Sequence, residues 1–238
     1  MKIHVITVCY NEEKLLPYFL KHYSFADLIT VYDNHSTDKS MEIVRKFPKT
    51  EIIKMTTKDE FNDDDLLWIK NTAYKGADYD WVIIVDVDEF LYHPNLLEKL
   101  EKYKNEGVTI PVTLGFNMYS KVFPTEDKPI TTLIQNGIFT KTHSKKVIFN
   151  PKVVSINYLI GAHECRPTGE VRLSSDLELY VLHYYYLSYQ DFIRKRKVLT
   201  SRLSEVNLKN DWSTHNKNFA KMEELDFNRL EKVMTKII

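Results

Sequence analysis

Three carboxylates, Asp86, Asp88 and Glu89, lie within four residues, directly after an apolar run that begins at Trp81. In extended chain, residues two apart point to the same side, so Asp86 and Asp88 repel each other unless protons or a cation lie between them. A divalent cation that also binds a phosphate-bearing ligand would remove this repulsion, because such ions prefer oxygen ligands. For an isolated Asp-x-Asp, the alternative is an acidic turn that is only solvated.

The apolar run before these acids is rich in β-branched residues, from Trp81 to Val85. This composition predicts a strand that is buried on both faces inside a parallel sheet. The acids then lie just past the carboxyl end of that strand. In open α/β sheets, ligands bind at this edge, because neighbouring connections diverge there and leave a crevice. The spacing therefore predicts a ligand site at the end of this strand.

Strand and helix alternate four times in the first part of the chain. The patterns predict strands over 3–8, 28–32, 51–55 and from 81, with helices over 12–23, 36–47 and 63–75. Ser36 or Thr37 is the expected N-cap of the second helix. Short links between such elements are typical of a parallel sheet with crossover helices on its faces. The first half is therefore expected to be a nucleotide-binding type of α/β domain.

Beyond Pro94 the pattern changes to short β-like runs broken by proline and glycine. We expect a helix over 95–104, β-like runs over 108–119, 138–140, 146–149, 158–160 and 177–182, a helix after the capping box at Ser188 and Asp191, and a last helix over 216–238. This predicts a mixed-strand extension of the sheet. The expected organisation is one domain over 1–186, with a nucleotide-binding half over 1–95 and an acceptor half over 96–186, and a C-terminal helical extension over 187–238.

Composition excludes several classes of protein. Lysine and arginine total 33, as do aspartate and glutamate, so no global field attracts nucleic acid or an anionic membrane. Cys9 and Cys165 form no Cys-x-x-Cys pair, which argues against a disulfide scaffold or a structural zinc site. The apolar segment 3–8 is too short for a signal peptide, and no stretch has the roughly 20 apolar residues of a membrane span. We expect a soluble, cytoplasmic protein.

Three stretches, over 5–12, 31–38 and 85–90, lie at the ends of the first, second and fourth predicted strands. In this order they resemble the hallmark stretches of family 2-type glycosyltransferases of the GT-A fold, in the branch whose metal motif is Asp-x-Asp-Glu-Phe. The resemblance covers about the first 95 residues. It implies the fold of nucleotide-diphospho-sugar transferases, with a mostly parallel central sheet flanked by helices. It also implies a nucleotide-diphosphate-sugar donor, a Mn²⁺ or Mg²⁺ ion, and inversion at the anomeric carbon.

The same resemblance implies roles for residues at the strand ends. Asp88 would bind the metal directly, and Asp86 would approach the donor ribose or the metal through water. Asp33 would accept a hydrogen bond from a uracil or guanine ring. Tyr10 would pack beside that base, and Val8 would offer backbone contacts.

Further roles depend on residues outside these three stretches. Lys70 and Asn71 fall where the family often places a donor-contacting basic residue and an asparagine; a solvated helix face is the alternative. His183 resembles the late metal histidine of related enzymes, since it follows an apolar strand and precedes a capped helix. The alternative for His183 is a half-buried histidine at a strand end.

The general base is the hardest residue to assign. Glu164 lies at a plausible distance after the metal motif for the acid that deprotonates the acceptor hydroxyl, with Asp127, Glu170 and Asp176 as rivals. A base must be within reach of that hydroxyl, which sequence does not show.

Several cationic and aromatic stretches have an ordinary explanation beside a functional one. His143, Lys145 and Lys146 could meet diphosphate oxygens, but lysines on a strand edge are usually only solvated. The run 194–197 could touch anionic lipid headgroups, although a solvated helix face is favoured. The tyrosines at 184–186 and Trp212 could stack on sugar rings, although core packing explains most such aromatics.

The leading hypothesis is a metal-dependent, inverting glycosyltransferase that moves a sugar from a nucleotide-diphosphate donor, with UDP expected, to a hydroxyl of a growing glycan or a lipid-linked acceptor. A sugar nucleotidyltransferase is an alternative, but such enzymes usually hold triphosphate in a glycine-rich loop, and residues 10–13 contain no glycine. The other alternative is a non-catalytic module that binds a nucleotide sugar or a partner protein. Any membrane contact would be weak and at the inner face.

Overall fold

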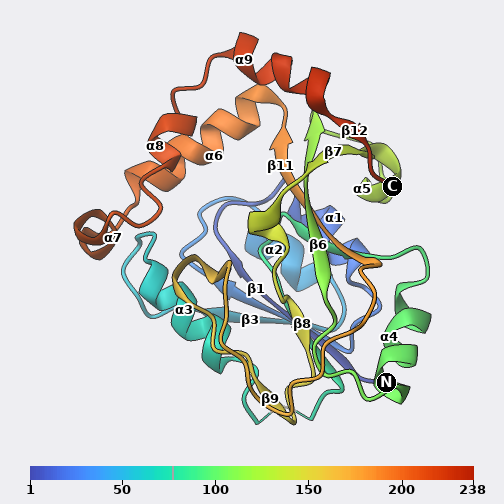
Figure 1. Cartoon of the computed structure of the whole chain (residues 1–238). Coiled ribbons are helices and arrows are strands. Elements are labelled where there is room, and N and C mark those ends of the chain that lie inside the picture. The colour runs from blue at the N-terminus through green and yellow to red at the C-terminus, as the bar shows by residue number, and fades with distance from the viewer. Residues whose placement is uncertain (77) are drawn as a thin grey trace.

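The computed structural model describes residues 1–76 and 78–238, and two five-stranded sheets form its centre (Figure 1). The first sheet has the order β3-β2-β1-β4-β8, and the second has the order β12-β7-β6-β11-β5. β9 (Val154–Ser155) and β10 (Thr168–Gly169) form a small two-stranded sheet that does not pair with either of these. Helices flank the sheets, and the α6 to α9 region covers one end of the second sheet (Figure 1).

The first sheet carries the nucleotide-binding pattern of the sequence. Its strands are β1 (Ile3–Cys9), β2 (Leu28–Asp33), β3 (Thr50–Lys54), β4 (Trp81–Ile84) and β8 (Ile148–Phe149). The first four pair in parallel, and β8 runs antiparallel to β4. The predicted parallel sheet is confirmed, and the carboxyl ends of β1, β2 and β4 lie at one edge.

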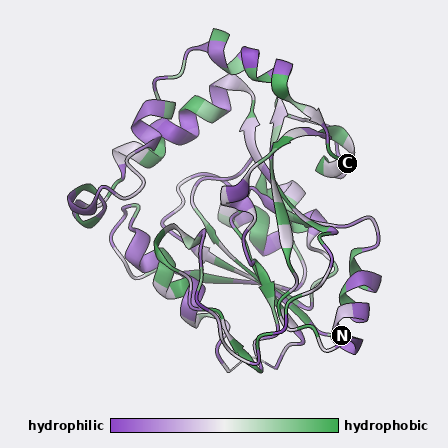
Figure 2. Ribbon diagram, in the orientation of Figure 1, coloured by the Kyte–Doolittle hydropathy of each residue, from purple (hydrophilic) through white to green (hydrophobic). Residues whose placement is uncertain are grey.

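Helices cover both faces of this sheet because the buried side chains of β1 alternate. Val5 faces α1 (Leu16–His22) and α2 (Ser40–Lys46), and Ile6 faces Leu67 of α3 (Asp63–Thr72). Hydrophobic colour follows the central strands, and hydrophilic colour dominates the outer helices (Figure 2). This two-sided burial fixes the strand ends rigidly.

The second sheet is the predicted mixed extension, and it is a separate sheet. Its strands are β5 (Glu89–Tyr92), β6 (Thr113–Ser120), β7 (Asn136–Phe139), β11 (Leu179–Leu187) and β12 (Thr235–Lys236). β11 pairs in parallel with β6 and antiparallel with β5. Because β4 ends at Ile84 and β5 begins at Glu89, the acidic turn is the link by which the chain passes from one sheet to the other.

Short helical segments join these strands. They are α4 (Leu96–Asn105), α5 (Ile130–Leu133), η1 (Lys141–His143) and η2 (Ile160–Ala162). The β-like run predicted over 158–160 is wrong, because it leads into η2 and makes only an isolated bridge from Tyr158 to Cys165.

The C-terminal part begins with α6 (Tyr189–Ser201), whose predicted cap is confirmed. Ser188 Oγ accepts a hydrogen bond from the Asp191 N–H at 3.2 Å and donates one to the Asp191 carboxylate at 2.8 Å. After α7 (Glu205–Asn210), the predicted helix over 216–238 is broken into α8 (Asn216–Phe219), α9 (Glu224–Arg229), η3 (Leu230–Val233) and β12.

The break in the last helix has a packing reason. Phe219 and Phe227 both pack on Phe192 of α6, with ring centroids 6.1 and 5.6 Å away. In one straight helix these two rings would be about 12 Å apart along the axis, so both could not contact the same side chain. Folding back also lets β12 pair with β7 in the second sheet.

Two helix starts differ from the prediction. α1 begins at Leu16 and α2 at Ser40, so the predicted cap at Ser36 or Thr37 is wrong. Asn11 takes these backbone groups instead: its Oδ1 accepts from the Thr37 N–H at 2.7 Å and from the Asp38 N–H at 3.2 Å. The loops after β1 and β2 therefore brace each other. Within the described residues, no helix has both the length and the apolar composition that crossing a membrane requires.

Candidate functional site

A cavity of about 590 Å³ opens at the carboxyl ends of β1 and β4, between the two sheets and α6. Six of the predicted site residues line it: Val8, Tyr10, Lys70, Asp86, Asp88 and His183. The strand ends, α3, the segment around η1, β11, α6 and the region of α8 all contribute lining residues. The cavity thus brings together segments from both halves of the chain.

Three predicted site residues do not line the cavity. Asp33, at the end of β2, is 7% exposed, and its carboxylate accepts a hydrogen bond from the Ser36 N–H at 2.9 Å. The Asn71 amide donates to the Tyr158 carbonyl at 3.0 Å and accepts from the Tyr158 N–H at 2.7 Å. Glu164 is exposed. The roles of these three toward a donor or acceptor stay predictions.

Asp86 is held by two lysines. The ammonium of Lys70 on α3 lies 2.7 Å from one carboxylate oxygen, and that of Lys145 lies 3.8 Å from the other. Burial would raise the pKa of Asp86, but these two ammonium groups outweigh it and hold the pKa below its ordinary value. Asp86 is therefore ionised throughout the neutral pH range.

Glu89, the first residue of β5, is 1% exposed and supports the acidic turn. Its carboxylate accepts from the Asp86 N–H at 3.1 Å and pairs with the Lys145 ammonium. Lys145 is itself buried, and although burial would lower its pKa, Glu89 and Asp86 keep that pKa above its ordinary value. Glu89 thus supports the turn, through a hydrogen bond from its backbone and a buried ion pair with Lys145.

Asp88, in the acidic turn, is contacted by side chains from β11 and α6. His183 Nε2 lies 3.5 Å from Asp88 Oδ1, and the Lys195 ammonium lies 3.1 Å from Asp88 Oδ2. Burial would raise the pKa of Asp88, but Lys195 and His183 hold it well below its ordinary value. His183 lies inside β11, which continues to Leu187, so its predicted place after the end of a strand is wrong.

The histidines around Asp88 form a stack that could hold a metal ion. The ring of His143 stacks on that of His183 with centroids 4.1 Å apart, and ligand atoms of Glu89, His143 and His183 all lie within 4.8 Å of one another. His183 Nδ1 lies 2.9 Å from Asn117 Oδ1, and this contact orients the ring so that Nε2 faces Asp88.

The donor set fits a divalent cation. His143 Nδ1 is buried and has no hydrogen-bond partner among the described residues. Burial and the neighbouring His183 lower the pKa of His143 to about 2, so this ring is neutral and able to bind an ion. A carboxylate with imidazole nitrogens favours Mn²⁺ over Mg²⁺, which prefers an all-oxygen shell.

At the other end of the cavity, Tyr10 is covered by a cation from the C-terminal part. The Arg202 guanidinium lies 3.3 Å from the centre of the Tyr10 ring, and its Nη2 donates to the Asn34 carbonyl at 3.2 Å. Backbone hydrogen bonds join Phe61 to Arg202 at 2.6 Å and to Ser204 at 3.0 Å. One face of Tyr10 is therefore occupied by Arg202.

The helix α6 supplies cavity residues that sequence reasoning missed. Lys195 pairs with Asp88 and Glu12, and Arg196 is 8% exposed, stacks on Tyr185 at 4.2 Å and donates to Asn216 at 3.0 Å. The solvated-face interpretation of 194–197 is therefore wrong for these two residues. The signal was helical spacing, because residues 195 and 196 share a face with the apolar residues 192 and 199.

The tyrosine run divides between core and cavity. Tyr184 is 2% exposed and belongs to the core, whereas Tyr185 and Tyr186 line the cavity. Trp212 does not line it.

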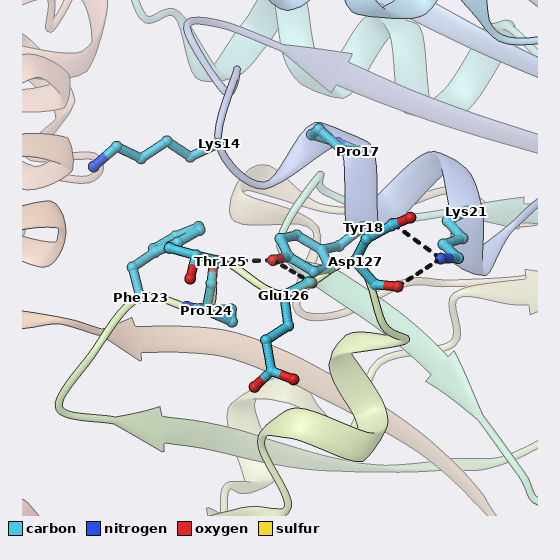
Figure 3. Close-up of a pocket in the computed structure, with 9 residues that line it drawn as sticks. All are labelled: Lys14, Pro17, Tyr18, Lys21, Phe123, Pro124, Thr125, Glu126 and Asp127. Atoms are coloured by element: carbon cyan, nitrogen blue, oxygen red, sulfur yellow. Dashed lines mark hydrogen bonds and ion pairs between the residues drawn. The ribbon is translucent and has the colours of Figure 1, made fainter.

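A second, shallower cavity of about 430 Å³ lies between α1 and the loop around 123–127 (Figure 3). Tyr18 donates there to the carbonyls of Pro124 and Glu126, at 2.9 and 3.0 Å, and Lys21 pairs with Asp127 at 3.0 Å. These contacts are between groups of the chain itself, and they fasten the loop to α1.

Comparison with known proteins gives one family. A model of glycosyltransferase family 92 matches residues 5–238. No curated protein sequence matches the chain.

Solved structures give the fold. Staphylococcus aureus TarS 1-349 in complex with UDP matches with a TM-score of 0.50 and 17% identity, over 92% of this chain and 70% of that chain. The TarS 1-349 structure and its complex with UDP-GlcNAc give TM-scores of 0.47 and 0.48, both at 16% identity and over 92% of this chain, and over 69% and 70% of those chains. The two sheets with their flanking helices, and the likeness to the UDP complex at a TM-score of 0.50, confirm the predicted α/β fold class.

Proposed function

The chain belongs to glycosyltransferase family 92, and we propose that it transfers a sugar from a nucleotide-diphosphate donor to a hydroxyl of a glycan or a lipid-linked acceptor. The observation that carries the proposal is the set of contacts at Asp88. This acid of the turn after β4 lies beside His183 of β11 and Lys195 of α6. The glycosyltransferase suggested by the strand-end motifs is supported by this family, and their resemblance to family 2 and its metal motif stays a prediction.

The proposed metal site consists of Asp88 and His183, with His143 beside them. A Mn²⁺ ion there would neutralise the diphosphate that leaves as the sugar is transferred. The chain's own contribution is to fix these donors: Asn117 orients His183, and the pairing of Glu89 with Lys145 holds the turn that presents Asp86 and Asp88.

The charges of the cavity suit a diphosphate. Its lining includes five carboxylates and six lysine or arginine side chains, so the empty cavity is nearly neutral. A divalent cation would make it clearly positive, and the two negative charges of a nucleotide-diphosphate sugar would then be balanced. This argument favours a donor that binds together with its metal ion.

UDP is the donor nucleotide to test first. The TarS structure that shares the fold is described as a complex with UDP. Val8 and Tyr10 line the part of the cavity where the base is proposed to bind, and Asp33, which lies opposite Cys9 in the parallel register, ends the neighbouring strand. A nucleotidyltransferase is less well supported, because the loop 10–13 offers two acids and no glycine to a triphosphate.

Inversion requires a group that removes the proton of the acceptor hydroxyl. Glu164 is the residue proposed from sequence, and its exposed position means that an acceptor would have to bring its hydroxyl to the rim of the cavity. His163, the preceding residue, does line the cavity, and its Nδ1 is 2.9 Å from the Thr142 carbonyl oxygen.

The test is donor turnover by the full chain. UDP-, GDP- and dTDP-sugars are incubated with Mn²⁺, with Mg²⁺ or with EDTA, and release of the nucleoside diphosphate is measured. We expect turnover of a UDP-sugar that requires a divalent cation, with Mn²⁺ the better ion. Equal turnover in EDTA would remove the metal from the proposal, and no turnover of any donor would favour a non-catalytic module. The anomeric configuration of the product, measured by NMR, tests inversion.

A further inference from the structure

Lys195 has an unusual pair of partners. Its ammonium lies 2.7 Å from a carboxylate oxygen of Glu12, in the loop after β1, and 3.1 Å from one of Asp88. Both carboxylates follow strands of the first sheet, Glu12 after β1 and Asp88 after β4, whereas Lys195 belongs to α6. This one side chain therefore connects α6 to two strand ends.

We propose that Lys195 occupies the metal side of Asp88 only while the donor is absent, and that it moves onto the donor's diphosphate when the cation and the donor bind. The inference rests on the proposed function and adds to it a residue for the leaving diphosphate. It also predicts that the cation and the donor help each other to bind.

Charge repulsion is the reason for Lys195 to leave Asp88 when a cation binds there. Asp88 already has Lys195 at one oxygen and His183 at the other. Like charges a few ångströms apart repel each other, and a divalent ion doubles the repulsion that a single charge would exert. A cation at Asp88 would therefore repel the Lys195 ammonium strongly unless an anion arrives beside both.

The other two lysines of the cavity are differently placed. Lys145 pairs with buried Glu89, and Lys70 pairs with Asp86. Neither lies within 4 Å of an Asp88 oxygen, so neither has to leave when a metal ion binds Asp88. Among the lysines that line this cavity in the described residues, Lys195 alone is paired with the expected metal ligand.

Lys195 is also built to move while its helix stays in place. Arg196, the next residue, is fixed by Tyr185 and Asn216, and Phe192 is buried one turn earlier. The lysine side chain is a point charge on a flexible four-carbon stem, so its ammonium can change partner without a backbone movement. Burial would lower the pKa of Lys195, but Asp88 and Glu12 keep it above its ordinary value, so the group that moves is charged.

Lys195→Met tests the inference, because it should change two affinities in opposite directions. Mn²⁺ alone should bind the variant about tenfold more tightly, since Asp88 is freed from its competitor. At saturating Mn²⁺, UDP should bind it at least about tenfold more weakly, while UMP, which lacks the second phosphate, should lose less. Mn²⁺ binding is followed by electron paramagnetic resonance, and nucleotide binding by calorimetry.

The matched control is Lys197→Met, because Lys197 lies on the same helix, is exposed and does not line the cavity. It should leave both affinities unchanged. If Lys195→Met fails to fold, Lys195→Gln keeps a polar side chain and carries the same two expectations. Unchanged Mn²⁺ affinity, or a shift of both affinities in the same direction, would overturn the inference while leaving the proposed function intact. Failure of the unmodified protein to bind Mn²⁺ or UDP would instead overturn the proposed function, and this inference with it.

Discussion

The two walls of the cavity are built in different ways. The strand-end wall comes from β1, β4 and the acidic turn, and its acids are set by a backbone that is buried on both faces. The opposite wall comes from β11, α6 and the residue that follows α6, and these supply His183, Lys195 and Arg202. The difference is that one side offers carboxylates at buried strand ends, and the other offers long side chains that reach these carboxylates from a distant part of the chain.

Asp88→Asn should have the largest effect, because it removes the charge on which the walls meet. We expect a loss of at least about a thousandfold in kcat, since a catalytic metal contributes several kcal/mol to the transition state. Mn²⁺ binding should be lost as well. Asp78→Asn, an exposed residue paired with Lys152, is the control and should keep full activity. Unchanged turnover in the Asp88 variant would show that the walls do not share a metal.

Two lysines that pair with acids of the strand-end wall allow support of the turn to be measured. Lys145→Met should lower the free energy of unfolding by about 3–5 kcal/mol, because it leaves the buried Glu89 carboxylate without a partner. Lys70→Met should cost about 1 kcal/mol or less, because the Asp86 side chain is 43% exposed. Urea unfolding of both variants measures the difference. Equal losses would mean that Glu89 does not support the turn.

Acid should destabilise the first sheet through a buried histidine near the amino end of β1. Burial lowers the pKa of His4, on β1, to about 4, whereas the unfolded chain has the ordinary value near 6.5. Between these values only the unfolded state binds the proton, so stability falls as pH decreases from about 6.5, by up to about 1.4 kcal/mol per pH unit for this group. Urea unfolding at pH 7, 6 and 5 should show a shallower decline for His4→Gln. Identical slopes would contradict the buried, neutral histidine.

Arg202→Met removes a contact of the opposite wall with Tyr10. We expect a loss of about 1 kcal/mol in unfolding free energy, because cation–π contacts at partly exposed sites are worth about that much. The matched variant Tyr10→Leu should have a similar cost, and the double variant should cost less than the sum of the two. Additive costs would show that the stacked arrangement contributes nothing to stability.

Glu164→Gln should have the smallest effect, within a few-fold in kcat, because its side chain is exposed and does not line the cavity. A general base usually contributes about 10²–10⁴-fold. A loss of a hundredfold or more, measured as initial rates of transfer, would therefore make Glu164 the base after all and extend the catalytic site to the rim of the cavity.

The two walls also differ in how well their residues could be predicted from the sequence. The strand-end wall could be predicted, because an apolar strand followed by polar residues is a local pattern, and parallel strands bring their ends together. The pairing of Lys195 with Glu12 could not, since 183 positions separate the two residues and no local pattern links them. Within the acidic turn, β5 begins at Glu89, and this residue is a buried support of the turn.

The C-terminal part shows the same limit. Its helical composition predicted one helix over 216–238, but the packing of Phe219 and Phe227 on one ring of α6 divides it. Tertiary contacts of this kind override helix propensity, which differs by less than about 1 kcal/mol per residue among ordinary residues.

The most direct test of a cavity shared by a metal ion and a nucleotide is the thermal stability of the full chain with UDP, with Mn²⁺, and with both. A ligand that binds only the native state raises Tm, and ligands that bind together raise it by more than the sum of their separate effects. We expect a clear rise with UDP and Mn²⁺ together, a small rise with either alone, and no joint rise in Asp88→Asn. An equal rise with UDP in EDTA, or no rise under any condition, would contradict the account.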